Sequence, residues 1–227
     1  MSVELKLVKQ QAAGLDGLHL RVRTAQKEFH ARLLEVERTG GLTPHRYARF
    51  LSMQYHLTRG VQRHFYCIAG NEDLASRRGL RKFLVEFANE EELHFQIAER
   101  DLLAMGEKPL PRPLDVSLWW AYFDSIVATR PFVRLGATAI LENLSGQSQE
   151  LISRIMSNAP HINQANSRFI VIHRHDKLPH GDQVLEALAS TSLEPRHTAD
   201  LEEGAETAMV LYFRLADWAF GPQGGNP

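Results

Sequence analysis

Apolar residues recur at three- and four-residue spacing along almost the whole chain, which is the spacing of one face of an amphipathic helix. The clearest example is a helix predicted over residues 15–38, whose apolar stripe consists of Leu18, Val22, Ala25, Phe29 and Leu33. The chain shows no sustained two-residue alternation bounded by Asn-Gly or Asp-Gly turns, which would indicate strands. The pattern therefore predicts an all-α fold.

Glycine and proline mark the ends of the first predicted helices. A Gly40-Gly41 pair ends the first helix, and Thr43-Pro44 opens a second one that extends to residue 70, because threonine is a favourable N-cap and proline suits the first helical position. A third helix is predicted over residues 78–105. Three prolines follow between residues 107 and 113, and their missing N–H donors predict a connector there.

The second half of the chain continues as helices. They are predicted over residues 115–129, 131–157, 163–177, 182–191 and 196–220, and Pro179 marks a kink or a boundary. The chain has no internal repeat, no low-complexity linker and no shift in composition. We therefore predict a single domain over residues 1–227, built as a bundle of seven or eight helices with a loose tail from about residue 221.

Composition and charge narrow the class of protein further. The chain has 227 residues, of which 44% are apolar and 23% are charged, and this excludes a disordered polymer. Its 26 basic and 27 acidic residues leave no net field that would favour nucleic acid or an anionic membrane surface, and no run approaches the length of a membrane span. A single cysteine, Cys67, and the lack of a signal-like N-terminus predict a cytoplasmic protein.

Acidic and imidazole side chains gather at separate points of the predicted helices, which is how helical bundles build metal sites in their cores. Glu91 and His94 are spaced i, i+3, so both point from one helix face and suit one ion. A solvated acidic face explains this pair equally well. Glu142 lies in the small and apolar stretch 136–146, where a buried carboxylate needs a compensating charge such as a cation. The alternative is that Glu142 faces solvent. The small residues beside it indicate either room for a ligand or close helix packing.

A histidine-rich stretch follows an apolar run late in the chain. His173, Asp176 and His180 stand at i, i+3 and i+7, so a continuous helix places them on one face, and this donor set suits iron, manganese or zinc. Histidines exposed on the surface are the alternative. Pro179 bends or ends that helix. His56, in the second helix, is predicted as an additional ligand or a proton-handling group, and simple packing is the alternative. The pattern assigns no catalytic residue beyond these ligands.

The order and spacing of these clusters resemble the heme-oxygenase-like superfamily, and within it the non-heme di-iron oxidases and oxygenases. The resemblance covers about residues 15 to 215. It implies one helical domain in which two irons, held by carboxylates and histidines, activate dioxygen against amino-acid-like or fatty-acid-like substrates. Carried over, the acid-x-x-His motif falls on Glu91 and His94, the lone glutamate on Glu142, and the late histidines on His173 and His180.

The sequence departs from this pattern at two positions. The family spaces its last motif His-x-x-x-Asp-x-x-His, and here Lys177 stands at the aspartate position with Asp176 one residue earlier. Either Asp176 substitutes as a ligand or the second metal site is weakened or lost. An earlier helix of the family often supplies a glutamate, and its place falls near His56, so a histidine replaces it or that ligand is missing.

Two relatives in the superfamily imply other functions. Heme oxygenases bind heme through a histidine on the first helix, and the stretch from Arg23 to His30, with residues 144–147, resembles their proximal histidine and distal helix. Pyrroloquinoline-quinone synthase and the thiaminase-like proteins use the same cavity without iron, as enzymes or as binding proteins.

The prediction is an iron-dependent oxidase or oxygenase with one or two non-heme irons, dioxygen as co-substrate and a small-molecule substrate. It has no nucleic-acid or membrane partner. A homodimer is suggested by the apolar residues of the last helix, namely Val210, Leu211, Phe213 and Trp218.

Overall fold

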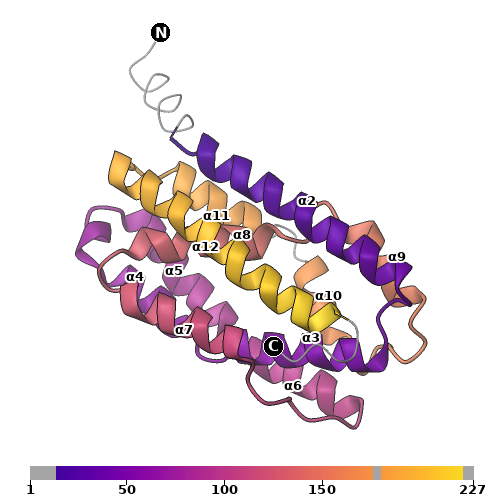
Figure 1. The fold of residues 1–227 in the computed structure, drawn as a ribbon. Helices are drawn as coiled ribbons and strands as arrows, with labels where there is room; N and C mark the ends of the chain where they lie inside the picture. The colour runs from indigo at the N-terminus through magenta and orange to yellow at the C-terminus, as the bar shows by residue number, and fades with distance from the viewer. Residues whose placement is uncertain (1–13, 176–179, 222–227) are drawn as a thin grey trace.

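The computed structural model describes residues 14–175 and 180–221, with only the backbone described at 173–175. These residues form helices and turns without any strand, which confirms the all-α prediction (Figure 1). The predicted tail beyond residue 221 lies outside the described residues. The buried apolar side chains form one continuous core.

The helices follow one another through short connections. Their bounds are α2 (Asp16–Arg38), α3 (Pro44–Thr58), α4 (Gln62–Ala69), the 3₁₀ turn η1 (Glu72–Leu74), α5 (Arg78–Glu91), α6 (His94–Ala104), α7 (Leu114–Ile126), α8 (Pro131–Asn143), α9 (Gln149–Ser157), α10 (Arg168–His175), α11 (His180–Ala189) and α12 (Pro195–Phe220).

Three helices predicted as continuous are each divided in two. Gly60, with φ +91°, separates α3 from α4, in a backbone conformation that glycine adopts readily. The stretch 144–148 separates α8 from α9, and Glu92-Leu93 separates α5 from α6. The last break has no glycine or proline to mark it. The helical spacing of apolar residues continues across it, and the sequence therefore predicted one helix there.

The two longest helices, α2 and α12, lie side by side and run in the same direction (Figure 1). Arg21 pairs with Glu206 at 2.5 Å near their starts, and Arg32 pairs with Asp217 at 2.8 Å near their ends. The apolar stripe predicted for the first helix is buried along this contact and against α8.

Helix α8 crosses α12 at very short range through two glycines. A Cβ atom built on Gly136 would lie 2.0 Å from the carbonyl oxygen of Leu201, and one built on Gly204 would lie 1.7 Å from that of Val133. No side chain fits at either distance. Of the two explanations for the small residues of this helix, close packing accounts for Gly136.

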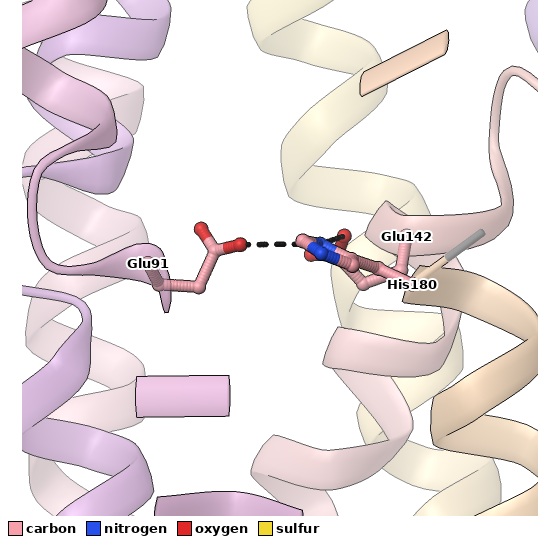
Figure 2. A group of neighbouring side chains, drawn as sticks. All are labelled: Glu91, Glu142 and His180. Carbon is pink, nitrogen blue, oxygen red and sulfur yellow. Dashed lines mark ion pairs between the residues drawn. The ribbon is translucent and has the colours of Figure 1, made fainter. Parts of the chain in front are cut away.

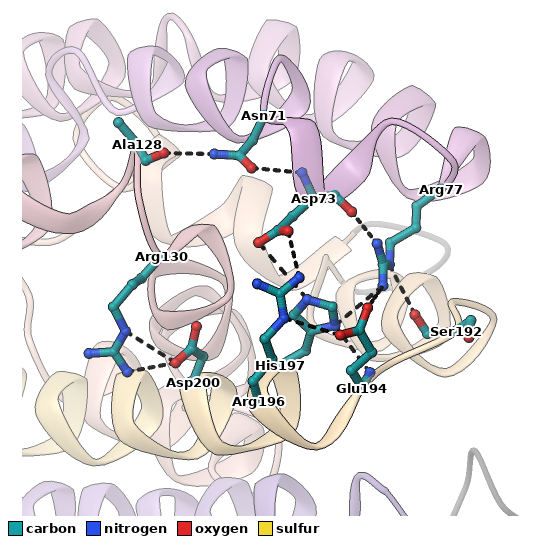
Figure 3. A network of polar contacts seen from close by, with 10 residues as sticks. All are labelled: Asn71, Asp73, Arg77, Ala128, Arg130, Ser192, Glu194, Arg196, His197 and Asp200. Atoms are coloured by element: carbon teal, nitrogen blue, oxygen red, sulfur yellow. Dashed lines mark hydrogen bonds and ion pairs between the residues drawn. The ribbon is translucent and has the colours of Figure 1, made fainter.

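A network of hydrogen bonds and ion pairs connects the start of α12 with neighbouring turns (Figure 3). Arg196 pairs with Asp73 of η1 at 2.8 Å, and Arg130, just before α8, pairs with Asp200 at 2.6 Å. Inside the network, the backbone N–H of Glu194 donates to Nδ1 of the buried His197 at 3.1 Å. These contacts hold α8 and α12 in a fixed register at one end of the bundle.

Across residues 14–175 and 180–221, no helix combines the length and apolar character that crossing a bilayer requires.

Candidate metal centre

Side chains from three helices converge on one point in the bundle (Figure 2). Glu91 is the last residue of α5, Glu142 lies near the end of α8, and His180 is the first residue of α11. Nδ1 of His180 lies 3.4 Å from Oε1 of Glu91 and 3.7 Å from Oε2 of Glu142. One donor atom from each residue lies within 4.8 Å of the other two.

This spacing fits a single metal ion. An ion bound about 2.1 Å from each donor keeps its ligands roughly 3.0 to 4.2 Å apart. The two distances from His180 fall in this range, and the donor oxygens of Glu91 and Glu142 lie within 4.8 Å of each other. Two carboxylates and an imidazole form a hard-to-borderline donor set that suits iron, manganese or zinc.

His94 contacts this group through the carboxylate of Glu91. Its Nδ1 lies 2.8 Å from Oε2 of Glu91, so Glu91 presents one oxygen to His94 and the other to His180. The break between α5 and α6 lies between these two residues, and both are buried. The ring of His94 stacks on that of His180 with centroids 6.4 Å apart. A carboxylate held by a buried histidine is oriented for a ligand on its other oxygen.

The surrounding charges act strongly on both histidines. Burial by itself lowers the pKa of His180, but the hydrogen bonds and charges of Glu142 and Glu91 outweigh it and raise that pKa to about 10. Burial also opposes the charged form of His94, and its hydrogen bond with Glu91 leaves its pKa above the ordinary value. Without a metal, the proton that His180 holds at neutral pH therefore offsets part of the negative charge of Glu91 and Glu142.

The two carboxylates lie on the wall of a cavity of about 190 Å³. Most of the wall is apolar, from Leu33 and Phe29 on α2 to Ile152 and Ile155 on α9. This volume is smaller than the usual pocket for a drug-sized ligand, so the space suits a small molecule. Trp119 contributes to the wall as well as to the core.

Two predicted ligands fall where the structure gives no side-chain position. His173 belongs to α10, but only its backbone is described. Asp176 and the neighbouring Lys177 lie outside the described residues. The roles assigned to His173 and Asp176 therefore stay predictions.

His56 does not reach the centre, contrary to its prediction as an additional ligand. Its Nε2 lies 2.7 Å from the backbone carbonyl oxygen of Leu110, in the proline-rich connector. Its own backbone carbonyl accepts a hydrogen bond from Nε1 of Trp120 at 3.0 Å. These contacts make His56 a packing residue that fastens the connector to α3, which is the alternative considered for it.

His30, the counterpart of a proximal heme ligand, also lies away from the cavity wall. Its Nδ1 is 3.1 Å from the hydroxyl of Ser148, while the preceding residue, Phe29, lines the cavity. A Cβ atom on Gly146 would meet the side chain of Gln26 at 2.8 Å. The glycine of the distal-helix resemblance thus lies against a side chain of α2.

Arg134, a fully buried guanidinium on the same cavity wall, was not among the site residues predicted from the sequence. The signal was present, because Arg134 is a lone charge in the apolar start of α8, as Glu142 is near its end. Tyr212 and Gln54 also line the cavity, and Nε2 of Gln54 donates to the Tyr212 hydroxyl at 3.3 Å.

Comparison with known proteins identifies the fold. No protein-family model matches the sequence, and no curated protein does. The structure is similar to a crystal structure from Shewanella denitrificans OS217, described as a domain of unknown function with a heme oxygenase-like fold. The match has a TM-score of 0.68 at 23% identity, covering 96% of this chain and 90% of that one. This chain therefore has a heme oxygenase-like fold.

Proposed function

We propose that the protein is a non-heme iron-dependent oxidase or oxygenase that acts with dioxygen on a small organic substrate, amino-acid-like or fatty-acid-like, held in the cavity. The observation that carries the proposal is the convergence of Glu91, Glu142 and His180 beside an apolar cavity. A surface cluster of acids would have no such cavity. These three residues would hold the iron, and iron bound there would supply the electrons for dioxygen that no side chain of the set can provide.

Each residue of the centre has a separate task. Glu91 and Glu142 supply anionic oxygens, and His180 supplies a neutral nitrogen once its proton has left. His94 holds the second oxygen of Glu91 and so fixes the orientation of that carboxylate. The apolar wall excludes water and places the substrate against the two carboxylates.

The proposal covers one iron or two. The three clustered donors suit one ion, and a second ion needs further ligands, for which His94 and His173 are the candidates. The number of irons per chain distinguishes these cases directly.

Anaerobic loading with ferrous iron tests the proposal. The protein is desalted, its iron is counted by mass spectrometry, and oxygen uptake is followed with amino acids and fatty acids. We expect one or two irons per chain, and a loss of at least about tenfold in retained iron for Glu142→Gln. The control is Glu150→Gln, which changes an exposed glutamate of α9, the helix that follows α8. This variant should retain as much iron as the parent protein.

One observation favours a second candidate function, which needs no metal. The 3.4 and 3.7 Å contacts of His180 also suit a protonated imidazole held between two carboxylates, as in a cofactor-free enzyme or binding protein on the same fold. Iron retention equal in the parent and Glu142→Gln, together with small-molecule binding that needs no metal, would replace the iron proposal with this one.

We further propose that the enzyme works in the cytoplasm and forms a homodimer. Free Cys67 fits a reducing compartment. Among the apolar residues that suggested a dimer, Val210 is exposed on α12 near Leu118 of α7, whereas Phe213 is buried. Light scattering on the purified protein measures the oligomeric state.

A further inference from the structure

Arg134 is a charged residue that the proposed iron centre does not use. Its side chain is 2% exposed and forms part of the cavity wall. Three aromatic rings surround the guanidinium, with centroids 5.2 to 5.9 Å from its central carbon, and they belong to Phe65, Trp119 and Phe123. Such rings favour a cation over their faces and leave its edge for hydrogen bonds.

A chain of hydrogen bonds holds the guanidinium in one orientation. Its Nε donates to Nδ1 of His64 at 3.2 Å, and Nε2 of His64 donates to Asp124 at 2.7 Å. Its Nη1 donates to the Thr138 hydroxyl at 2.7 Å. Arginine offers donors only, so His64 must accept at Nδ1 and carry its proton on Nε2. Asp124 is partly exposed, and the chain therefore runs from the surface to the cavity.

These contacts leave donor capacity on Arg134. Within the described residues, its Nη2 donates to no protein group, and no carboxylate lies within the 4.0 Å of an ion pair. Glu91 and Glu142 act on it only through longer-range attraction. These two carboxylates instead contact His94 and His180, at 2.8 to 3.7 Å. In the described part of the chain the guanidinium thus has no carboxylate in contact with it, and a buried charge of this kind is costly unless a ligand provides the countercharge.

We propose that Arg134 binds the carboxylate of the substrate and positions the rest of the molecule along the cavity. The inference rests on the proposed function only for the reaction that follows binding. A guanidinium with a free edge matches a carboxylate through paired N–H donors. The ligand class is a small amphiphilic carboxylic acid, with one anionic group and an apolar remainder.

The layout of the cavity agrees with such a ligand. Arg134 lies beside α4, whereas the apolar wall extends to Ile152 and Ile155 on α9, and Figure 1 places α4 and α9 on opposite sides of the molecule. Glu142 lies two helical turns beyond Arg134, about 12 Å along α8. A chain anchored at Arg134 therefore passes the carboxylates of the metal centre on its way to the apolar end.

Equilibrium binding of two matched probes tests the proposal. Octanoate and octanamide have the same apolar chain and differ in charge, and their binding is measured by calorimetry on metal-free and zinc-loaded protein. We expect the parent protein to prefer octanoate by at least about tenfold with or without metal, and Arg134→Gln to lose that preference. Arg23→Gln, an exposed arginine, is the control and should keep it.

A second variant separates binding from folding, because Arg134→Gln changes a buried group. Asp124→Asn alters a partly exposed residue at the far end of the hydrogen-bond chain, and we expect it to weaken octanoate binding several-fold while octanamide binding stays unchanged. Equal binding of both probes by the parent protein would overturn the proposal, as would an octanoate preference that survives in Arg134→Gln.

The outcomes also separate this inference from the iron proposal. An Arg134-dependent octanoate preference in a protein that retains no iron would support the anion site and contradict the iron enzyme. Octanoate binding that appears only with metal, and is lost in Glu142→Gln but not in Arg134→Gln, would place the carboxylate on the metal and contradict the role of Arg134.

Discussion

Single charged residues carry most of the functional information in this chain. Helix α8 is apolar along most of its length, yet it buries Arg134 and Thr138 and presents Glu142 to the same cavity. These three residues are spaced i, i+4 and i+8, so they follow one side of the helix. Burying a charge costs several kcal/mol unless a partner offsets it, which is why a charge in an apolar helix points to a ligand or a countercharge.

The raised pKa of His180 predicts how metal binding depends on pH. At a folded-state pKa of about 10, His180 holds a proton at neutral pH that a metal must displace. Apparent zinc affinity should therefore increase by up to about tenfold per pH unit between pH 6 and 8. Competition with a chelator of known affinity measures this slope, and a pH-independent affinity would contradict it.

Acid should destabilise the protein through His64. Burial, followed by the charge of Arg134, lowers the pKa of His64 to about 4. Between about pH 6.5 and 4 the unfolded chain therefore binds a proton at this residue that the folded chain does not, and the free energy of unfolding falls as the pH falls. Each pH unit contributes up to about 1.4 kcal/mol.

Urea unfolding at pH 7, 6 and 5 measures this effect as a difference between variants. We expect His64→Gln to show a smaller loss of stability on acidification than the parent protein. His45→Gln, which changes an exposed histidine, is the control. Identical pH profiles for His64→Gln and the parent would contradict the prediction.

At the level of elements, the fold depends on one close helix crossing. The carbonyl oxygens of Val133 and Leu201 occupy the places where Cβ atoms of Gly204 and Gly136 would be. This contact sets the distance between α8, which carries Glu142 and Arg134, and α12, which carries Tyr212. The cavity lies beside this crossing, so its width depends on the two glycines.

Gly204→Ala should destabilise the protein. The added methyl group would meet backbone rather than a flexible side chain, and overpacking of this kind costs about 1 to 3 kcal/mol. For a chain of this length the melting temperature should fall by about 2 to 4 °C per kcal/mol. Calorimetry measures the melting temperature. Gly79→Ala is the control, because a Cβ atom at Gly79 meets nothing within 4 Å. Equal melting temperatures would contradict the close crossing.

At the level of the whole molecule, the bundle encloses a small apolar space with carboxylates on its wall. Heme oxygenase-like describes the arrangement of its helices, and it leaves the cofactor open. The side chain that would bind heme, His30, contacts Ser148 instead of lining the space. The volume of about 190 Å³ suits a ligand much smaller than a porphyrin.

Hemin should therefore not bind through His30. On titration with hemin we expect no sharp Soret band that depends on this residue, so His30→Ala and the parent protein should give superimposable spectra. A Soret band in the parent that is lost in His30→Ala would contradict this prediction and favour the heme-binding alternative.

The fold was largely predictable, because helices depend on local spacing and on end signals. The predicted helix over residues 15–38 became α2, and Thr43-Pro44 opens α3 with the Thr43 hydroxyl accepting from the backbone N–H of Arg46. The break at Glu92-Leu93 was not predictable, since no local signal marks it. It depends on how α5 and α6 pack on the rest of the bundle.

The sequence alone was enough for the all-α class, for most helix positions and for the lone charge of Glu142 in an apolar stretch. Only the tertiary structure decided which charges meet. It brought Glu91 and His180 together from distant helices, turned His56 to the connector and placed Arg134 on the same cavity wall. The physical reason is that helix formation follows from neighbouring residues, whereas the meeting of two side chains depends on the packing of every element between them.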